Sequence, residues 1–163
     1  MTPNPTTAYV GVGSNLQDPV WHVEAALAEL GRMPRTRLVK RSSLYRSEPI
    51  GYAAQPEFVN AVAVLDTALA PHELLSELQG IEARHGRERS FPNAPRTLDL
   101  DLLLHGGRQQ ADPTLTLPHP RMHERAFVLK PLVELVPDIL IPGKGPAAAR
   151  LDACAGQGLE KIA

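Results

Sequence analysis

FVNAVAVLD, residues 58–66, is the clearest strand of the sequence, because its nine residues are rich in Val and include neither Gly nor Pro. A helical pattern stands on either side of it. Residues 19–30 carry apolar side chains at helical spacing, with Asp18 as the expected N-cap. Residues 71–85 repeat that spacing after the strand and begin with a proline. The strand is therefore predicted to lie between two helices.

Three further segments predict strands. Residues 8–12 form a short apolar run, residues 36–45 alternate imperfectly as an edge strand would, and residues 98–104 read LDLDLLL. Gly106 and Gly107 can turn this last strand into a short return strand. The order β-α-β-β-α-β is that of the split βαβ arrangement, an antiparallel sheet with helices packed on one face. We therefore expect an α+β fold.

The remaining segments carry weaker patterns. Residues 46–56 and 87–95 are rich in breakers and predict long loops, and a short helix is expected around residues 129–136. Residues 1–7 predict a loose lead-in. Residues 143–163 are rich in Gly and Ala and predict a weakly structured tail.

Composition bounds the class of protein. The 163 residues suit one domain, residues 1–163, and the net charge of −1 argues against nucleic-acid or anionic-membrane partners. The single cysteine, Cys154, excludes an intrachain disulfide and a multi-thiolate zinc site. No apolar run approaches the roughly 20 residues of a membrane span, and no basic residue opens a signal peptide. We expect a cytoplasmic protein.

Asp99 and Asp101 are the sharpest sign of chemistry. Residues two apart in a strand point to the same face, about 6.6 to 7 Å apart, while the leucines between them bury on the other face. Two such carboxylates repel each other unless a cation lies between them, and Mg²⁺ typically accepts one or two carboxylates plus substrate phosphates. When such a pair stands alone in a sequence, it more often belongs to an ordinary half-exposed strand whose polar residues face water.

The surrounding arginines favour the metal-phosphate interpretation. Of the 17 basic residues, 13 are Arg, whose planar fork binds phosphate through two parallel hydrogen bonds. Codon bias could explain how many arginines the chain has, but not where they lie in the sequence. The residues that flank the two carboxylates are Arg84, Arg87, Arg89 and Arg96 before them and His119, Arg121, His123 and Arg125 after them. Cations on both sides of paired acids fit a polyphosphate with its Mg²⁺.

Other motifs give weaker evidence about function. GVGSN at residues 11–15 lacks the residues of a phosphate-binding loop and predicts a tight turn. Cys154 has no base nearby in the sequence, so covalent catalysis has little support. Phe58 and Asn60 share a strand face and could stack on and hydrogen-bond a flat heterocycle, although a core Phe and an edge Asn is the commoner explanation. Four histidines are scattered without ligand spacing: His22, His72, His85 and His105.

Together these motifs resemble the 6-hydroxymethyl-7,8-dihydropterin pyrophosphokinase family of folate synthesis, over about residues 9–142. The most specific block is NAPRTLDLDLLL at residues 93–104. Four further blocks follow the order of the family: GSNL at 13–16, YRSEPIG at 45–51, QPEFVNAV at 55–62 and LPHPRMHERAFVLKPL at 117–132. The resemblance implies a ferredoxin-like fold and a single catalytic domain that transfers pyrophosphate from ATP to the pterin and releases AMP.

The resemblance also implies roles for individual residues. Asp99 and Asp101 would hold two Mg²⁺ ions and, with Arg87 and Arg96, form the catalytic set. The pterin would lie between Phe58 and Phe127, with Asn60, Ser47, Ile50 and Asp99 around it. The nucleotide would contact Gln79, Glu82, Arg87, Arg89, Arg96, Leu102, Thr116, His119 and Arg125. We expect ATP and the pterin to be the partners of a monomer.

Two positions depart from the family pattern. Pro120 follows the motif histidine where many members have Tyr, and Asn93 stands where many have Trp. Phe91 could replace that loop aromatic. Two other classes remain open from the residues alone: a metal-dependent phosphohydrolase, which would consume ATP without pterin, and a non-catalytic binding module, which would release no AMP.

Overall fold

The computed structural model describes residues 5–47, 58–85 and 98–162. Ile50, Arg87, Arg89, Phe91, Asn93 and Arg96 lie outside the described residues, as do the predicted loop 87–95 and most of the loop 46–56. The strands are β1 (Thr6–Ser14), β2 (Thr36–Arg41), β3 (Tyr45–Ser47), β4 (Phe58–Thr67), β5 (Leu98–His105), β6 (Gln110–Ala111), β7 (Thr116–Leu117), β8 (Leu140–Ile141), β9 (Gly145–Pro146) and β10 (Leu159–Lys161). The helices are α1 (Pro19–Leu30), α2 (Pro71–Arg84), the 3₁₀ helix η1 (Met122–Glu124), α3 (Ala126–Leu135) and α4 (Ala147–Asp152).

The main sheet is antiparallel at every described pairing. β4 pairs β1 along one edge, and β2 and then β3 along the other. β5 pairs the far side of β1, and β10 pairs β3. The predicted strand at 58–66 is thus a central strand, which explains why it is apolar on both faces.

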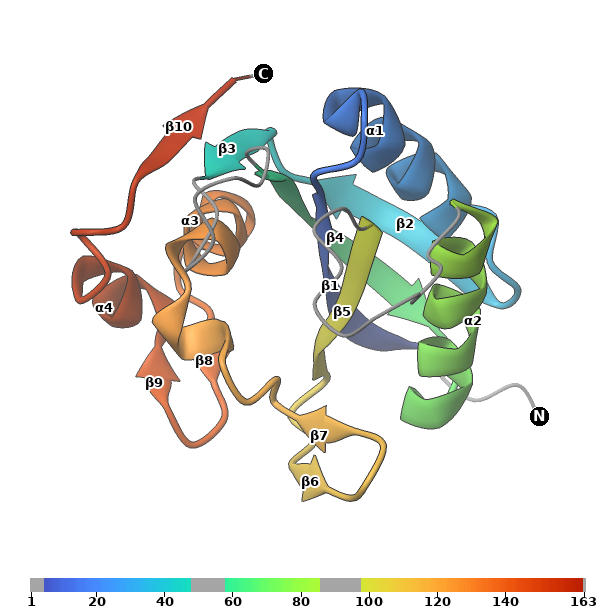
Figure 1. Cartoon of the computed structure of the whole chain (residues 1–163). Coiled ribbons are helices and arrows are strands. Elements are labelled where there is room, and N and C mark those ends of the chain that lie inside the picture. Colours follow the sequence, from blue (N-terminus) through green and yellow to red (C-terminus); the bar gives the residue numbers. More distant parts are fainter. Residues whose placement is uncertain (1–4, 48–57, 86–97, 163) are drawn as a thin grey trace.

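Helices cover both faces of this sheet (Figure 1). α1 and α2 pack on one face, where their leucines meet the alternate residues Val10 and Val12 of β1 and Leu100 of β5 in one core cluster. α3 and α4 lie on the other face in a second cluster with Val62. The prediction of helices on one face is correct for α1 and α2. It missed the second layer, because α4 is short and begins with three alanines.

Local sequence explains both long helices. α1 begins at Pro19 as predicted, but Asp18 has a φ of 57° and makes no side-chain cap hydrogen bond. The fixed φ of the proline therefore starts the helix without a capping carboxylate. α2 also begins at a proline, and the Glu73 carboxylate accepts the Ala70 N–H at 2.8 Å.

The structure corrects four boundaries. β1 runs from Thr6 to Ser14, so it takes in the end of the predicted lead-in and four of the five residues predicted as a turn. The predicted strand 36–45 is interrupted, because β2 ends at Arg41 and β3 begins at Tyr45. The return strand after Gly107 exists as β6, but it pairs β7. α3 begins at Ala126, three residues before the predicted helix.

The prediction of a weakly structured tail at residues 143–163 is wrong. This segment contains β9, α4 and β10, and β10 pairs β3 with Leu159 opposite Ser47. Ala147 and Cys154 are buried in the second core cluster. Small residues give a weak hydrophobic pattern in the sequence, but they allow α4 to pack closely on α3.

Candidate active site

β5 holds the two carboxylates as the alternation predicted. Leu98, Leu100 and Leu102 are at most 4% exposed and pack with α1 and α2. Asp99 and Asp101 are half-buried and alternate with them, so both point to the opposite face. After Asp101 the register with β1 shifts, and Leu103 and Leu104 both join the second core cluster. The core leucines thus hold the strand firmly beneath the acidic pair.

β1 contributes glycines to this same face. Gly13 pairs Asp99 on β5 and Asn60 on β4, while Gly11 pairs Asp101 and Val62. Residues in register point to the same side of a sheet, so the strand between the acids and β4 presents no side chain there. A Cβ on Gly13 would lie 2.9 Å from Asn60 Oδ1. Residues 11–14 are therefore part of strand β1, where Gly13 leaves room for the Asn60 side chain. The interpretation of this stretch as a tight turn was wrong.

One row of residues crosses four strands: Asp99 of β5, Gly13 of β1, Asn60 of β4 and Tyr45 of β3. Neighbouring strands lie about 4.8 Å apart, so Asp99 and Asn60 are separated by roughly 10 Å across a glycine. Asn60 is 4% exposed. Its Nδ2 donates to Ser47 Oγ at 2.6 Å, which fixes the direction of the amide.

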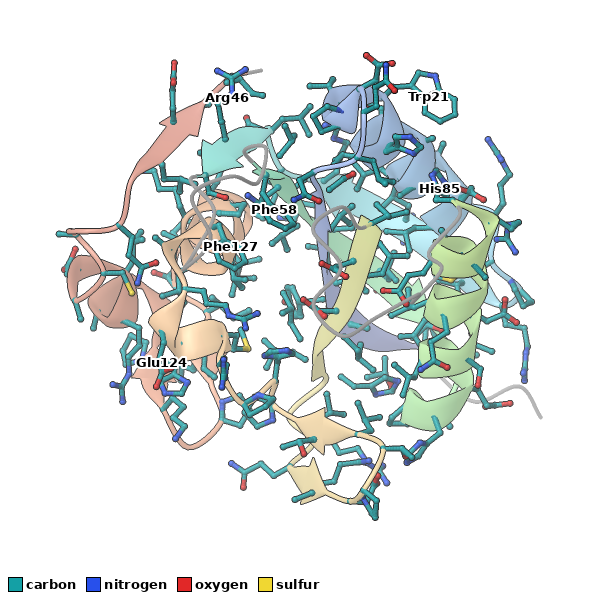
Figure 2. The ribbon with its side chains drawn as sticks, in the orientation of Figure 1. Trp21, Arg46, Phe58, His85, Glu124 and Phe127 are labelled. Atoms are coloured by element: carbon teal, nitrogen blue, oxygen red, sulfur yellow. The ribbon has the colours of Figure 1, made fainter. Side chains whose placement is uncertain are left out.

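Phe58 and Phe127 lie on the same side of the sheet (Figure 2). Phe58 begins β4 and is half-buried, and Phe127 is the second residue of α3, which packs against β4. The Arg125 guanidinium carbon lies 5.5 Å from the centroid of the Phe127 ring. We call Phe58, Phe127, Asn60 and Ser47 the aromatic patch. A flat ring could stack there while its polar edge meets the amide.

His119 is held as a neutral ring. Its ring Nδ1 accepts the backbone N–H of Arg121 at 3.1 Å, and the backbone N–H of His119 donates to the Leu103 carbonyl at 2.9 Å. Burial, together with the charges of Arg125 and Arg121, lowers the pKa of His119 to about 4. With Nδ1 accepting, the proton of the neutral ring resides on Nε2, which can donate to an anionic ligand.

This pKa predicts a stability change between pH 6.5 and 4. In that window the unfolded chain binds a proton at His119 that the folded chain does not, so the free energy of unfolding falls as the pH falls. Above pH 6.5 His119 is neutral in both the folded and the unfolded chain, so this loss of stability is absent. Urea unfolding at pH 7 and pH 5 should therefore show a smaller acid loss for His119→Gln than for the wild type. Equal losses in both proteins would refute the assignment.

Three nucleotide-side candidates belong to β5, which lies at the edge of the described sheet, and to α2, which packs beside it. Glu82 is 7% exposed, and its Oε2 accepts the Leu100 N–H at 2.8 Å, which joins α2 to this edge. Leu102 is 3% exposed in the core, so only its backbone can reach a ligand. Gln79 lies exposed on the same helix. Thr116 and Arg125 are half-buried in β7 and just before α3.

Sequence reasoning missed a histidine pair. His22 Nδ1 and His85 Nδ1 are 2.8 Å apart, and His85 Nε2 contacts Glu29 Oε2 at 2.5 Å. The exposed ring of Trp21 packs edge-on against His22 with centroids 5.0 Å apart. The pair joins α1 to the end of α2. A separation of 63 residues along the chain offers no local signal that could have predicted it.

A family model described as 7,8-dihydro-6-hydroxymethylpterin-pyrophosphokinase (HPPK) matches residues 9–137, a range that includes every candidate residue of this site. The chain belongs to this family. A curated member from Pseudomonas aeruginosa, named 2-amino-4-hydroxy-6-hydroxymethyldihydropteridine pyrophosphokinase, is 49% identical over 94% of this chain and 95% of its own. A protein of the same name from Haemophilus influenzae is 47% identical over 83% and 85% of the two chains.

Solved structures support the fold of the family. The chain superposes on an HPPK-DHPS protein in complex with substrates with a TM-score of 0.73 at 11% identity, covering 93% of this chain and 43% of that one. An HPPK-DHPS A437G structure with SDX-DHP from Plasmodium falciparum gives a TM-score of 0.74 at 13% identity, over 91% and 45% of the two chains. This chain thus spans less than half the length of these two proteins, and at such identities the likeness concerns the fold.

The described residues include neither a membrane-spanning helix nor a metal-binding cluster of three or more side chains. None of the helices in residues 5–47, 58–85 and 98–162 is long and apolar enough to span a membrane. Within the same ranges, no group of three or more His, Cys, Asp or Glu side chains is arranged to hold a metal ion. A metal at Asp99 and Asp101 would therefore have at most these two protein carboxylates from the described part of the chain.

Proposed function

We propose that this chain performs the reaction of its family, the transfer of pyrophosphate from ATP to 6-hydroxymethyl-7,8-dihydropterin with release of AMP. The observation that carries this proposal is the row of Asp99, Gly13 and Asn60. It offers a cation-binding end and a heterocycle-binding end about 10 Å apart, joined by a strand without side chains on that face. A pterin against the aromatic patch would extend its hydroxymethyl group toward the acids.

Asp99 and Asp101 fit Mg²⁺ by their donor chemistry. Both offer hard carboxylate oxygens on one strand face, and Mg²⁺ usually takes one or two carboxylates and fills its other positions with water and phosphate oxygens. We propose that these residues hold two Mg²⁺ ions against the phosphates of ATP. Held by these residues, the ions would neutralise phosphate charge and make the pterin hydroxyl more acidic.

The chain's own residues position the reactants in this proposal. Phe58 and Phe127 hold the pterin ring, and Asn60, fixed by Ser47, binds its edge. His119 presents Nε2–H to a phosphate oxygen, while Arg87 and Arg96 balance the charge of the transferring group. The pterin hydroxyl oxygen then forms a bond to the β-phosphorus as the in-line bond from that phosphorus to the bridging oxygen of AMP breaks, and the hydroxyl proton is lost to solvent. Positioning and charge neutralisation carry most of the catalysis in such transfers.

We further propose that the fold is ferredoxin-like. The sheet order β5-β1-β4-β2, with antiparallel neighbours and α1 and α2 on one face, supports this assignment. A monomeric state and a cytoplasmic location stay predictions from the sequence.

An assay of AMP release tests the function. The wild-type chain with ATP and Mg²⁺ should form AMP only when 6-hydroxymethyl-7,8-dihydropterin is added, and EDTA should stop the reaction. ATP consumption without pterin would instead indicate a phosphohydrolase that uses the acids to activate water. Ligand binding with no AMP under any condition would indicate a binding module.

Gly13→Ala should raise the KM for pterin. Its new Cβ would lie 2.9 Å from Asn60 Oδ1, so the amide must move away from Ser47. The amide would then no longer be directed at the edge of the pterin, and one lost hydrogen bond is worth about 0.5–1.5 kcal/mol, or roughly 2- to 12-fold in affinity. The matched control is Gly11→Ala, whose Cβ would meet Leu103 at an ordinary 3.6 Å. Steady-state kinetics that give both variants the same pterin KM would count against the role of Asn60.

A further inference from the structure

Glu134 joins the end of α3 to the segment around β3. Its Oε1 accepts the Tyr45 hydroxyl at 2.5 Å, and its Oε2 accepts both the N–H and the hydroxyl of Ser43 at 2.9 and 3.2 Å. Lys40 Nζ adds a bond to the Leu135 carbonyl at 2.9 Å. The last turn of α3 is thus bound at four points to residues of, or next to, β2 and β3. We call Glu134, Tyr45 and Ser43 the α3 clamp.

The clamp contains a charged carboxylate. Glu134 is an exposed residue whose carboxylate is partly covered; this partial burial opposes ionisation, but the hydrogen bonds from Tyr45 and Ser43 lower its pKa below the usual value. Burial and the adjacent carboxylate in turn raise the pKa of Tyr45, so the phenol keeps the proton that it donates. Hydrogen bonds to an ionised acceptor are roughly twice as strong as neutral ones. The contact therefore holds the helix more firmly than a neutral pair would.

Both ends of the clamp belong to elements that carry the aromatic patch. Glu134 lies seven residues after Phe127, nearly two full turns, so the two share one face of α3. Tyr45 lies two residues before Ser47 on β3, and the two share one face of that strand. In the sheet, Tyr45 pairs Asn60 and Ser47 pairs Phe58. The clamp thus connects the helix bearing one aromatic ring to the strands bearing the other.

We propose that the α3 clamp positions the pterin by fixing the separation between Phe127 and the Phe58–Asn60 side of the aromatic patch. This inference rests on the proposed function. A planar ring stacked between two side chains requires a defined gap, and a misplacement of about 1 Å can cost on the order of 100-fold in rate. Glu134 and Tyr45 are then positioning residues, since they act through Phe127 and Asn60. Among the described nucleotide-side candidates, Arg125 adjoins the start of α3, nine residues before Glu134, while the others belong to β5, α2, β7 and the segment of His119, which supply no residue of the clamp.

The test is Tyr45→Phe, which removes one hydroxyl and keeps the ring, and Ser43→Ala, which removes a second donor by a smaller change. Steady-state kinetics should give a pterin KM raised about tenfold or more in Tyr45→Phe, with the ATP KM within about twofold of the wild type. The matched control is Glu24→Gln, which removes the negative charge and one acceptor from the exposed pair with Arg41, at 2.6 and 3.1 Å between α1 and β2. Its two KM values should not change.

The possible results distinguish a failure of the clamp proposal from a failure of the proposed function. A wild-type chain that forms no AMP with pterin refutes the proposed function itself. An active wild type with an unchanged pterin KM in folded Tyr45→Phe overturns the clamp, as does an equal rise of both KM values. Should Tyr45→Phe fail to fold, Ser43→Ala decides: a selective rise of its pterin KM supports the clamp, and unchanged kinetics overturn it.

Discussion

Asp99→Ala and Asp101→Ala should each abolish turnover while the chain stays folded. Each removes one of the two carboxylates that share one face of β5 and are proposed to hold Mg²⁺, so the metal that would neutralise the phosphate charge is bound more weakly. The fold should survive because β5 is held by Leu98, Leu100 and Leu102 on its other face. Pterin-dependent AMP release, with thermal unfolding and circular dichroism on the same samples, measures both parts.

A charge-matched control is Asp138→Ala, since Asp138 is exposed after α3 and lies outside the site. It should keep wild-type activity. Mg²⁺-dependent activity near the wild-type level in either Asp99→Ala or Asp101→Ala would show that the acids are not required. Loss of folding together with activity would give them a structural role in place of the catalytic one.

Arg96→Ala should lower kcat by about 100- to 1000-fold. We expect Arg96 to bind charge that develops on the transferring group, and the loss of one such preorganised donor costs about 2.7–4 kcal/mol. An interaction made mainly in the transition state lowers kcat and kcat/KM together. Arg96→Lys should rescue little, because a lysine cannot reproduce the two parallel hydrogen bonds of the guanidinium.

Single-turnover measurements with saturating ATP and pterin report this step directly. Arg37→Ala is the control, since Arg37 is exposed on β2 and pairs with Asp66 at 3.0 Å. Its rate should match the wild type. A change in Arg96→Ala that is confined to KM, with kcat preserved, would assign this arginine to ground-state binding only.

Much of the fold could be predicted because its strong elements have local signals. The central strand β4, the two proline-initiated helices and the alternation of LDLDLLL were all read correctly, since each buries a regular apolar pattern. The elements that failed have little such pattern. α4 and β10 bury small residues or few residues, and their places depend on contacts with α3 and β3 far away in the sequence.

The candidate site likewise has parts that the sequence predicted and parts that it did not. The direction of Asp99 and Asp101 follows from the period of a strand, which a sequence displays. Gly13 was misread, because its reason lies in Asn60, a neighbour across the sheet that no local motif indicates. The same holds for the α3 clamp, where Tyr45 and Glu134 are 89 residues apart. Long-range register, more than local propensity, sets these parts of the site.

The most direct test is a crystal structure of the chain with Mg²⁺, a non-hydrolysable ATP analogue and the pterin. We expect density for divalent ions between the phosphate oxygens and both carboxylates of β5, with the pterin against Phe58, Asn60 and Phe127. Carboxylates turned away from the nucleotide, with no ion beside them, would contradict the account.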